Sequence, residues 1–220
     1  MIKIGNVEVM GLEHAIRGMR NPMNSWEKSD SEWEWVEDES PINPNDPGMC
    51  YLLGENDLTL AKKLANAGPV HGKFLRMIAV YMDVTAPLYW WKEFDTYKVG
   101  TVANSCSTMH KIHAKEFTLD DFSHEHLCDL ALAEMSGFLC TMNFYRKMFV
   151  EHDKKEYWWQ MIQLLPSSYN QKRTVMLNYE VLRNMYTCRK NHKLDEWRDF
   201  CKAIEKLPYS ELFTGEKGGK

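Results

Sequence analysis

Hydrophobic and polar positions follow two different periods along this chain. A β-type pattern, in which neighbouring side chains alternate or β-branched residues cluster, predicts strands at residues 2–9, 74–85 and 171–177. Apolar residues spaced three or four apart predict longer helices at residues 57–67, 118–150, 154–165, 179–188 and 192–206. These about three strands and five longer helices are segregated rather than alternating, which predicts an α+β fold.

Two helix starts carry local capping signals. Thr118 and Asp121 have the spacing of a capping box, which predicts that they open the long helix ending near residue 150. Asn178 directly follows the predicted strand at 171–177 and is expected to cap the helix at 179–188. Short helices are also expected at residues 14–20 and 88–94.

Residues 26–48 differ in composition from the rest of the chain. This segment combines seven acidic residues within positions 26–39 with three tryptophans and three prolines: Trp26, Trp33 and Trp35, then Pro41, Pro44 and Pro47. The prolines rule out a continuous helix through the second half. We expect a long surface insertion whose tryptophans anchor it to the body or to another subunit, and a flexible acidic loop is the alternative.

Composition places the chain among single-domain globular proteins. With 220 residues, 44% of them hydrophobic, it can bury one substantial core, so residues 1–220 are expected to form one domain. No apolar run approaches the roughly 18 residues of a membrane span, and no signal peptide precedes the first strand. We therefore expect a cytoplasmic protein without membrane contacts. A net charge of −4 argues against nucleic acid as a partner.

Cysteine and histidine patterns give weaker signals. The six cysteines form no Cys-x-x-Cys pair, which favours reduced, buried thiols. His110 with His113, and His124 with His126, have spacings that occur in metal sites, but no cysteine or acid nearby completes a ligand set, so no metal is expected. Cys106 is more simply a small loop residue than a nucleophile.

Residues 71–112 contain the chain's most informative order of elements. A β-type run ends at Pro87, an aromatic helix follows at 88–94, and a small polar loop follows at 100–108. Val84-Thr85-Ala86-Pro87 and Trp91-Lys92-Glu93-Phe94 resemble the approach to the signature motif of the flavin-dependent thymidylate synthases.

The second half of the chain resembles the same family. There the family has an Asn, a second Asn on a helix, Leu-Arg, and then His-x-x-x-Glu, and this chain has Asn178, Asn184, Arg189, and His192 with Glu196. Arg189 is a planar, permanently charged donor that suits a pyrimidine carbonyl or a phosphate, and a surface salt bridge is the alternative. His192 and Glu196 are expected on one helix at i,i+4, where a solvated ion pair is equally compatible.

The family signature itself is only partly kept. Its Arg-His-Arg is replaced by Thr96-Tyr97-Lys98, and its Asn-Glu-x-Ser-x-Arg-Tyr by residues 104–110, which keep Asn104 and Ser107 but lack the acid and the arginine. Glu180 stands where the second motif has an arginine. Loss of a bidentate phosphate clamp costs binding energy unless other groups replace it.

The resemblance implies a fold, a reaction and a set of site residues. It implies a central antiparallel sheet flanked by helices, a homotetramer, and methylation of dUMP or a related pyrimidine nucleotide at C5, with FAD as cofactor and NADPH and methylenetetrahydrofolate as co-substrates. It implies Arg189 as the catalytic residue that polarises the pyrimidine. It implies these cofactor-binding residues: His71, Lys98, Asn178, Asn184 and His192. It implies these substrate-binding residues: Asn104, Ser105, Ser107 and Arg189. The alternative is an atypical member that binds a nucleotide or a protein partner without thymidylate synthase activity.

Overall fold

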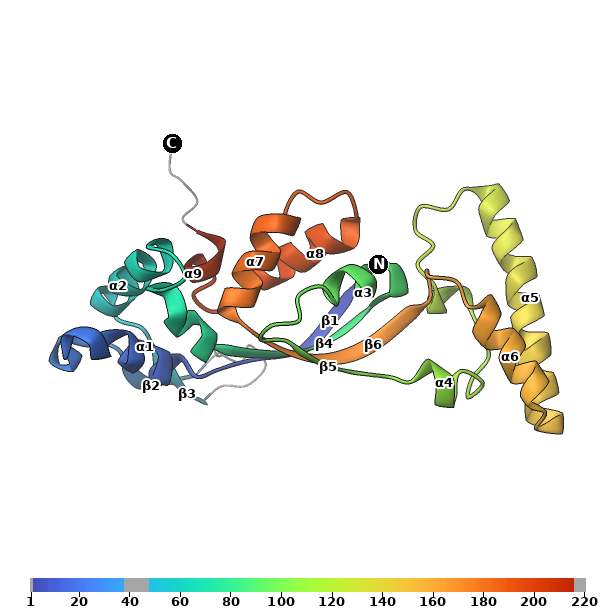
Figure 1. Cartoon of the computed structure of the whole chain (residues 1–220), viewed down its shortest axis with the longest axis horizontal. Coiled ribbons are helices and arrows are strands. Elements are labelled where there is room, and N and C mark those ends of the chain that lie inside the picture. Colours follow the sequence, from blue (N-terminus) through green and yellow to red (C-terminus); the bar gives the residue numbers. More distant parts are fainter. Residues whose placement is uncertain (1, 38–47, 216–220) are drawn as a thin grey trace. The chain divides into compact units, whose positions relative to one another are not determined.

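A computed structural model describes residues 2–37 and 48–215 (Figure 1). Its strands are β1 Lys3–Met10, β2 Glu32–Val36, β3 Gly48–Leu52, β4 Ala79–Pro87, β5 Val102–Ser105 and β6 Asn170–Asn178. Four of them form one sheet in the order β1-β4-β6-β5, and β2 pairs with β3. The fold is α+β with an antiparallel sheet flanked by helices, so the predicted fold class is confirmed.

The helices match most of the predicted segments. They are α1 Leu12–Arg20, α2 Glu55–Asn66, α3 Leu88–Phe94, α4 Thr108–Lys111, α5 Asp129–His152, α6 Lys155–Leu164, α7 Tyr179–Arg189, α8 Asp195–Ile204 and α9 Glu211–Thr214. Short 3₁₀ turns are η1 Asn21–Met23, η2 Trp26–Lys28, η3 Gly72–Met77 and η4 Leu119–Asp121.

The residues group into two compact units. Unit 1 comprises Met1–Lys3, Val84–Thr96 and Asn104–Arg173, and unit 2 comprises Ile4–Asp83, Tyr97–Ala103 and Thr174–Lys220. Strands β4 and β6 each contribute residues to both units.

Unit 1 contains a small core beneath the helices α5 and α6. Its buried members are Ile112, Phe117, Phe122, Met142 and Met161. The predicted capping box of Thr118 and Asp121 is present, but it caps η4, and the long helix begins only at Asp129. The prediction that the box opens the long helix was wrong, because Phe122 leaves the turn in extended conformation, is almost fully buried, and forms a β-bridge with Tyr169.

Unit 2 packs α1, α2, η3, α7 and α9 together. Within the predicted strand at 74–85, residues 74–77 belong instead to η3. Phe74 and Leu75 are both buried although they are adjacent, which a half-buried strand does not allow, since its side chains point alternately to opposite faces. Alternation begins only with β4, where Val80, Met82 and Val84 are buried.

The segment at 26–48 forms a strand where only a surface insertion was expected. Glu32 to Val36 pairs antiparallel with Gly48 to Leu52, and residues 38–47 lie outside the described residues. Trp33 and Trp35 alternate with Glu32 and Glu34, so the period of two was present, but the acids and prolines suggested a loop.

The polar stretch at 100–108 also contains an unpredicted strand. Val102–Ser105 is the terminal strand of the four-stranded sheet, next to β6, and all four of its side chains are exposed. Apolar and polar side chains do not alternate along β5, because backbone hydrogen bonds to β6 hold this edge strand in place and neither of its faces is buried.

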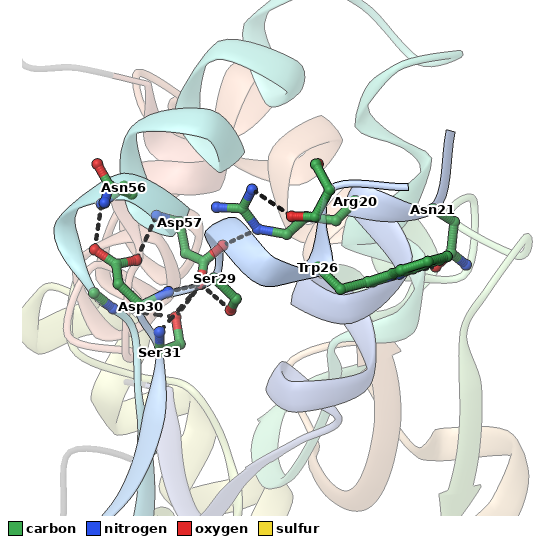
Figure 2. Close-up of polar contacts among 10 residues, drawn as sticks. Arg20, Asn21, Trp26, Ser29, Asp30, Ser31, Asn56 and Asp57 are labelled. Atoms are coloured by element: carbon green, nitrogen blue, oxygen red, sulfur yellow. Dashed lines mark hydrogen bonds and ion pairs between the residues drawn. The ribbon is translucent and has the colours of Figure 1, made fainter. Parts of the chain in front are cut away.

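A buried ion pair ties the chain before β2 to α1 and α2 (Figure 2). The Asp57 carboxylate, fully buried, accepts from Arg20 Nε at 2.6 Å and from the hydroxyls of Ser29 and Ser31 at 2.6 Å each. The backbone N–H groups of Asp30 and Ser31 donate to the same carboxylate at 3.2 Å. Burial raises the pKa of Asp57, but the two serine hydroxyls and the Arg20 guanidinium outweigh this and hold the pKa below its ordinary value.

Asp30 satisfies the first turn of α2 from outside the helix (Figure 2). Its carboxylate accepts from the backbone N–H groups of Asn56 at 2.8 Å and Asp57 at 3.0 Å. These are orphan donors of a helix start. A Cβ at Gly54 would lie 2.2 Å from Asp30 Cγ, so only glycine allows this approach.

Candidate functional site

Arg189, the last residue of α7, lies against two aromatic rings in unit 2, Tyr97 and Trp197, which contact each other edge-on with their centres 6.1 Å apart. Its guanidinium carbon lies 4.9 Å from the centre of the Trp197 ring and 5.7 Å from that of Tyr97. Its Nε donates to the Tyr97 hydroxyl at 3.0 Å. Trp197 is fully buried on α8, so it forms a fixed wall for the cation. These contacts fix the position of the Arg189 guanidinium in the protein without a ligand.

Tyr97 is the residue that sequence reasoning missed at this site. It lies at the middle of the replaced Arg-His-Arg signature, so its position was a usable signal. Burial raises the pKa of its phenol, and Arg189 only partly opposes that rise. The phenol is therefore neutral near pH 7, and its oxygen is an acceptor for Arg189.

His192 extends the cluster but does not stand on a helix with Glu196. Its Nε2 lies 3.0 Å from Arg189 Nη1, and its Nδ1 accepts from the backbone N–H of Leu194 at 3.2 Å. Because α8 begins only at Asp195, after the extended Leu194, the expected i,i+4 helical pair with Glu196 is wrong. A neutral imidazole has one acceptor nitrogen, so it accepts from Leu194 or from Arg189 at any moment.

Asn178 caps α7, as predicted. Its side-chain oxygen accepts from the Val181 N–H at 3.1 Å. Gly100 has a positive φ of 77°, and a Cβ there would lie 2.9 Å from Asn178 Nδ2. The Asn178 amide therefore lies directly against the Gly100 backbone, while its oxygen accepts from Val181.

Asn184, Lys98 and His71 are exposed residues of unit 2. Asn184 and Arg189 lie five residues apart on α7, which places them about 140° apart around the helix axis. Between Lys98 and β5, the Thr101 hydroxyl is buried and has no hydrogen-bond partner among residues 2–37 and 48–215. No sequence signal pointed to Thr101.

Glu180 has a partner of its own. Arg76 donates to it through Nε at 2.5 Å and Nη2 at 3.0 Å, which is a bidentate pair between η3 and α7. The carboxylate at this position, where the family's second motif has an arginine, thus has a guanidinium beside it from another element.

Asn104, Ser105 and Ser107 belong to unit 1. Asn104 and Ser105 are exposed on β5, the edge strand. Ser107 caps α4, where its hydroxyl accepts from the His110 N–H at 3.2 Å and lies 2.8 Å from His110 Nδ1. Cys106 continues the pairing with β6 through its N–H, which donates to the Lys172 carbonyl at 2.9 Å.

Unit 1 holds a second clamped arginine, which the sequence did not indicate. The Arg173 guanidinium carbon lies 4.2 Å from the centre of the Trp91 ring, and Nη1 donates to Asp95 at 2.8 Å. Nε donates to the Gln171 side chain at 3.0 Å. Because its charge is neutralised by Asp95, Arg173 is a weaker candidate than Arg189 for binding an anion.

The placement of the His, Cys, Asp and Glu side chains bears on metal and thiol chemistry. Residues 2–37 and 48–215 contain no group of three His, Cys, Asp or Glu side chains placed to hold a metal ion. The expectation of buried thiols holds for Cys50 and Cys201 and is wrong for the others, which are exposed and free: Cys106, Cys128, Cys140 and Cys188. No helix in the described ranges combines the length and apolar character needed to cross a bilayer.

Comparison with solved structures identifies the fold. The chain is similar to thymidylate synthase X from Helicobacter pylori, solved with FAD and dUMP, with a TM-score of 0.67 and 17% sequence identity over 98% of both chains. A second structure of the flavin-dependent enzyme from the same organism, also complexed with FAD and dUMP, gives a TM-score of 0.65 at 17% identity and covers 98% of this chain and 100% of that one.

Sequence comparison adds no relative. No protein-family model matches the chain, and no curated protein sequence matches it. The structural likeness nevertheless extends over nearly the whole length of both proteins. The chain therefore has the fold of the flavin-dependent thymidylate synthases, at an identity of 17%.

Proposed function

We propose that this chain is a divergent, flavin-dependent thymidylate synthase-like enzyme that methylates dUMP or a related pyrimidine nucleotide at C5. The observation that carries the proposal is the likeness to the Helicobacter pylori enzyme over 98% of both chains. The series Asn178, Asn184 and Arg189 supports it, because these residues recur in the order and spacing that the resemblance expects.

Arg189 is the proposed catalytic residue. Methylation at C5 needs electron density on that carbon, and negative charge then develops on the ring oxygens of the pyrimidine. A guanidinium that is fixed before the reaction stabilises such charge without reorganising. Trp197, Tyr97 and His192 fix it, so their role is to position Arg189.

Unit 2 contains hydrogen-bond donors and a cation of the kinds that bind a flavin nucleotide. When bound, FAD would supply the hydride that completes the methyl group, after reduction by NADPH, with methylenetetrahydrofolate as the carbon donor. The unpartnered Thr101 hydroxyl and the exposed Lys98 supply a donor and a cation for phosphate oxygens. The other proposed cofactor-binding residues are His71, Asn178, Asn184 and His192. The proposed substrate-binding residues of unit 1 are Asn104, Ser105 and Ser107.

Absorbance and kinetics test the proposal together. Freshly purified protein is expected to show flavin absorbance or to take it up from added FAD, and its NADPH oxidation is expected to depend on dUMP. Arg189→Lys should lower kcat/KM for dUMP by at least about tenfold, because a lysine cannot keep the planar fork. Arg17→Lys, at an exposed position of α1, is the matched control and should leave kcat/KM unchanged. Colourless protein that binds no FAD and ignores dUMP would refute the enzyme.

A second function is favoured by the replaced signature. Positions 96–98 and 104–110 lack the arginines and the acid that the family motif carries. A protein with this fold that binds a nucleotide or a protein partner without synthase activity would then be expected. Calorimetry distinguishes the two: dUMP binding without dUMP-dependent NADPH oxidation supports the second function.

We also propose a homo-oligomer, with a tetramer as the expected state. The 24-residue helix α5 buries only Met142, while Leu130 is 74% exposed and Phe144 and Val150 are more than half exposed. A helix apolar on several sides is typical of one covered by another chain. Sedimentation velocity of the protein and of Phe144→Glu tests this, and an unchanged monomer in both would contradict it.

Two further expectations stay proposals. We propose that residues 1–220 fold as a single domain, since β4 and β6 run through both units and a cut between the units would break both strands. A single cooperative urea transition, seen by fluorescence and circular dichroism alike, is the expected result. We also propose a cytoplasmic location, which fractionation of the source cells tests.

A further inference from the structure

A hollow of about 260 Å³ lies in unit 2, separate from the Arg189 cluster. Its lining comes from the end of β1, the start of α1 and the β2–β3 hairpin. Val9, Leu12 and Tyr51 are buried there, whereas Trp33 is half exposed. The volume is below the roughly 300–1,000 Å³ of pockets for drug-sized ligands, so the hollow suits a single long side chain.

The hairpin register presents aromatic and apolar side chains on this side. Trp33 is paired with Tyr51, and Trp35 with Met49. Trp33 and Tyr51 make an edge contact with ring centres 5.6 Å apart. The indole Nε1 of Trp33 donates to Glu13 Oε2 at 3.3 Å, which fixes the ring beside a carboxylate. One exposed indole face and one carboxylate are thus offered together.

Negative charge predominates around the hollow. Glu8 and Glu13 are part of its lining, and both are on segments that flank Trp33. Burial raises the pKa of the Tyr51 phenol, hydrogen bonds with Ser31 and Ser29 oppose the rise, and the charges of Asp57 and Glu13 add to it. A positive charge comes from Arg17 on α1, which contacts His14, another lining residue, at 3.3 Å. Its charge leaves the sum over Glu8, Glu13 and Arg17 negative.

We propose that this hollow is a docking site for an arginine side chain of a partner protein. A guanidinium stacks on an indole face and donates in its plane to a carboxylate, and the hollow supplies both groups at one place through Trp33 and Glu13. Exposed Met10 and Met49 at the margin pack against the aliphatic part of such a side chain. The site is independent of the proposed synthase activity.

A pair of synthetic peptides tests the proposal on the full-length protein. The probe is acetyl-Gly-Gly-Arg-Gly-Gly-amide, and the matched peptide carries citrulline, which is neutral and of the same shape, instead of arginine. Fluorine NMR of protein labelled with 5-fluorotryptophan resolves the eight tryptophans, and Trp33→Phe assigns the Trp33 signal. The arginine peptide at millimolar concentration is expected to shift the Trp33 signal, and the citrulline peptide is not.

A charge-matched variant pair separates a specific site from general attraction. Glu8→Gln with Glu13→Gln should weaken the arginine peptide by at least about tenfold, while glutamine at position 13 still accepts from the Trp33 indole. Glu116→Gln with Glu151→Gln removes the same two charges at exposed positions of unit 1 and should leave binding unchanged. The proposal is overturned if both peptides shift the Trp33 signal equally, or if both double variants weaken binding equally. It is also overturned if the Trp33 signal changes with protein concentration alone, because a second copy of the chain then covers the hollow.

Discussion

Asp57 offers the sharpest test of the packing at the base of the β2–β3 hairpin. Its carboxylate accepts five hydrogen bonds, one from Arg20, two from serine hydroxyls and two from backbone N–H groups. Asp57→Leu would leave the Arg20 guanidinium, 4% exposed, buried without its counter-charge. Breaking a buried pair on one side costs about 3–5 kcal/mol, a large part of the roughly 5–15 kcal/mol that stabilises a domain.

Removal of Arg20, the other member of the ion pair, is expected to lower the free energy of unfolding by less. Arg20→Met leaves the Asp57 carboxylate with its two serine hydroxyls and two N–H donors, which continue to solvate the charge. Arg20→Met combined with Asp57→Leu removes both charges, so its cost should be smaller than the sum of the single variants.

Urea unfolding followed by tryptophan fluorescence and circular dichroism measures these costs. Asp120→Asn, at an exposed position, is the control and should change the free energy of unfolding by less than about 0.5 kcal/mol. The reasoning is refuted if Asp57→Leu costs less than about 1 kcal/mol, or if the two single variants add up to the double.

Three further outcomes follow from the structure. The pKa of Asp57 is lower in the folded state than in the unfolded state, so its ionised carboxylate stabilises the fold fully above the ordinary Asp pKa of about 3.9. This stabilisation is lost as the pH falls through the lower folded value, and urea midpoints measured across this acid range check it. Tyr97→Phe removes the acceptor for Arg189 Nε, so dUMP affinity measured by calorimetry should fall by roughly three- to tenfold while the urea midpoint changes little, and unchanged affinity would contradict the positioning role. Burial raises the pKa of the Cys201 thiol to about 12, so at pH 8 Cys201 and the buried Cys50 of the native protein should resist a thiol reagent that labels the four exposed cysteines. Mass spectrometry of the labelled peptides checks this, and labelling of Cys201 would contradict it.

Local signals in the sequence predicted the elements that local interactions determine. The helix at 88–94 was predicted with the bounds that the structure has, because Pro87 fixes its start and the aromatic residues bury one side. Asn178 was predicted to cap α7 and does so, since an N-cap bond spans only three residues.

Features that depend on distant pairing were missed for a physical reason. The edge strand β5 has no buried side chain, so its existence depends on hydrogen bonds to β6, about 70 residues away in the sequence. The clamp on Arg189 likewise brings Tyr97 across 92 positions, and no local period encodes such a contact. Arg189 itself was found only because its spacing from Asn184 resembles a family motif.

The aromatic clamp on Arg189 has a thermodynamic consequence for any anion that it binds. A free arginine side chain carries about 2 kcal/mol of rotamer entropy, which a ligand must remove when it immobilises the group. Against the Trp197 and Tyr97 rings, and with Nε bonded to the Tyr97 hydroxyl, much of that freedom is already lost on folding. If the side chain kept this rotamer freedom until a ligand bound, the dissociation constant would be up to roughly thirtyfold higher. The two rings therefore increase the affinity for an anion without contacting it.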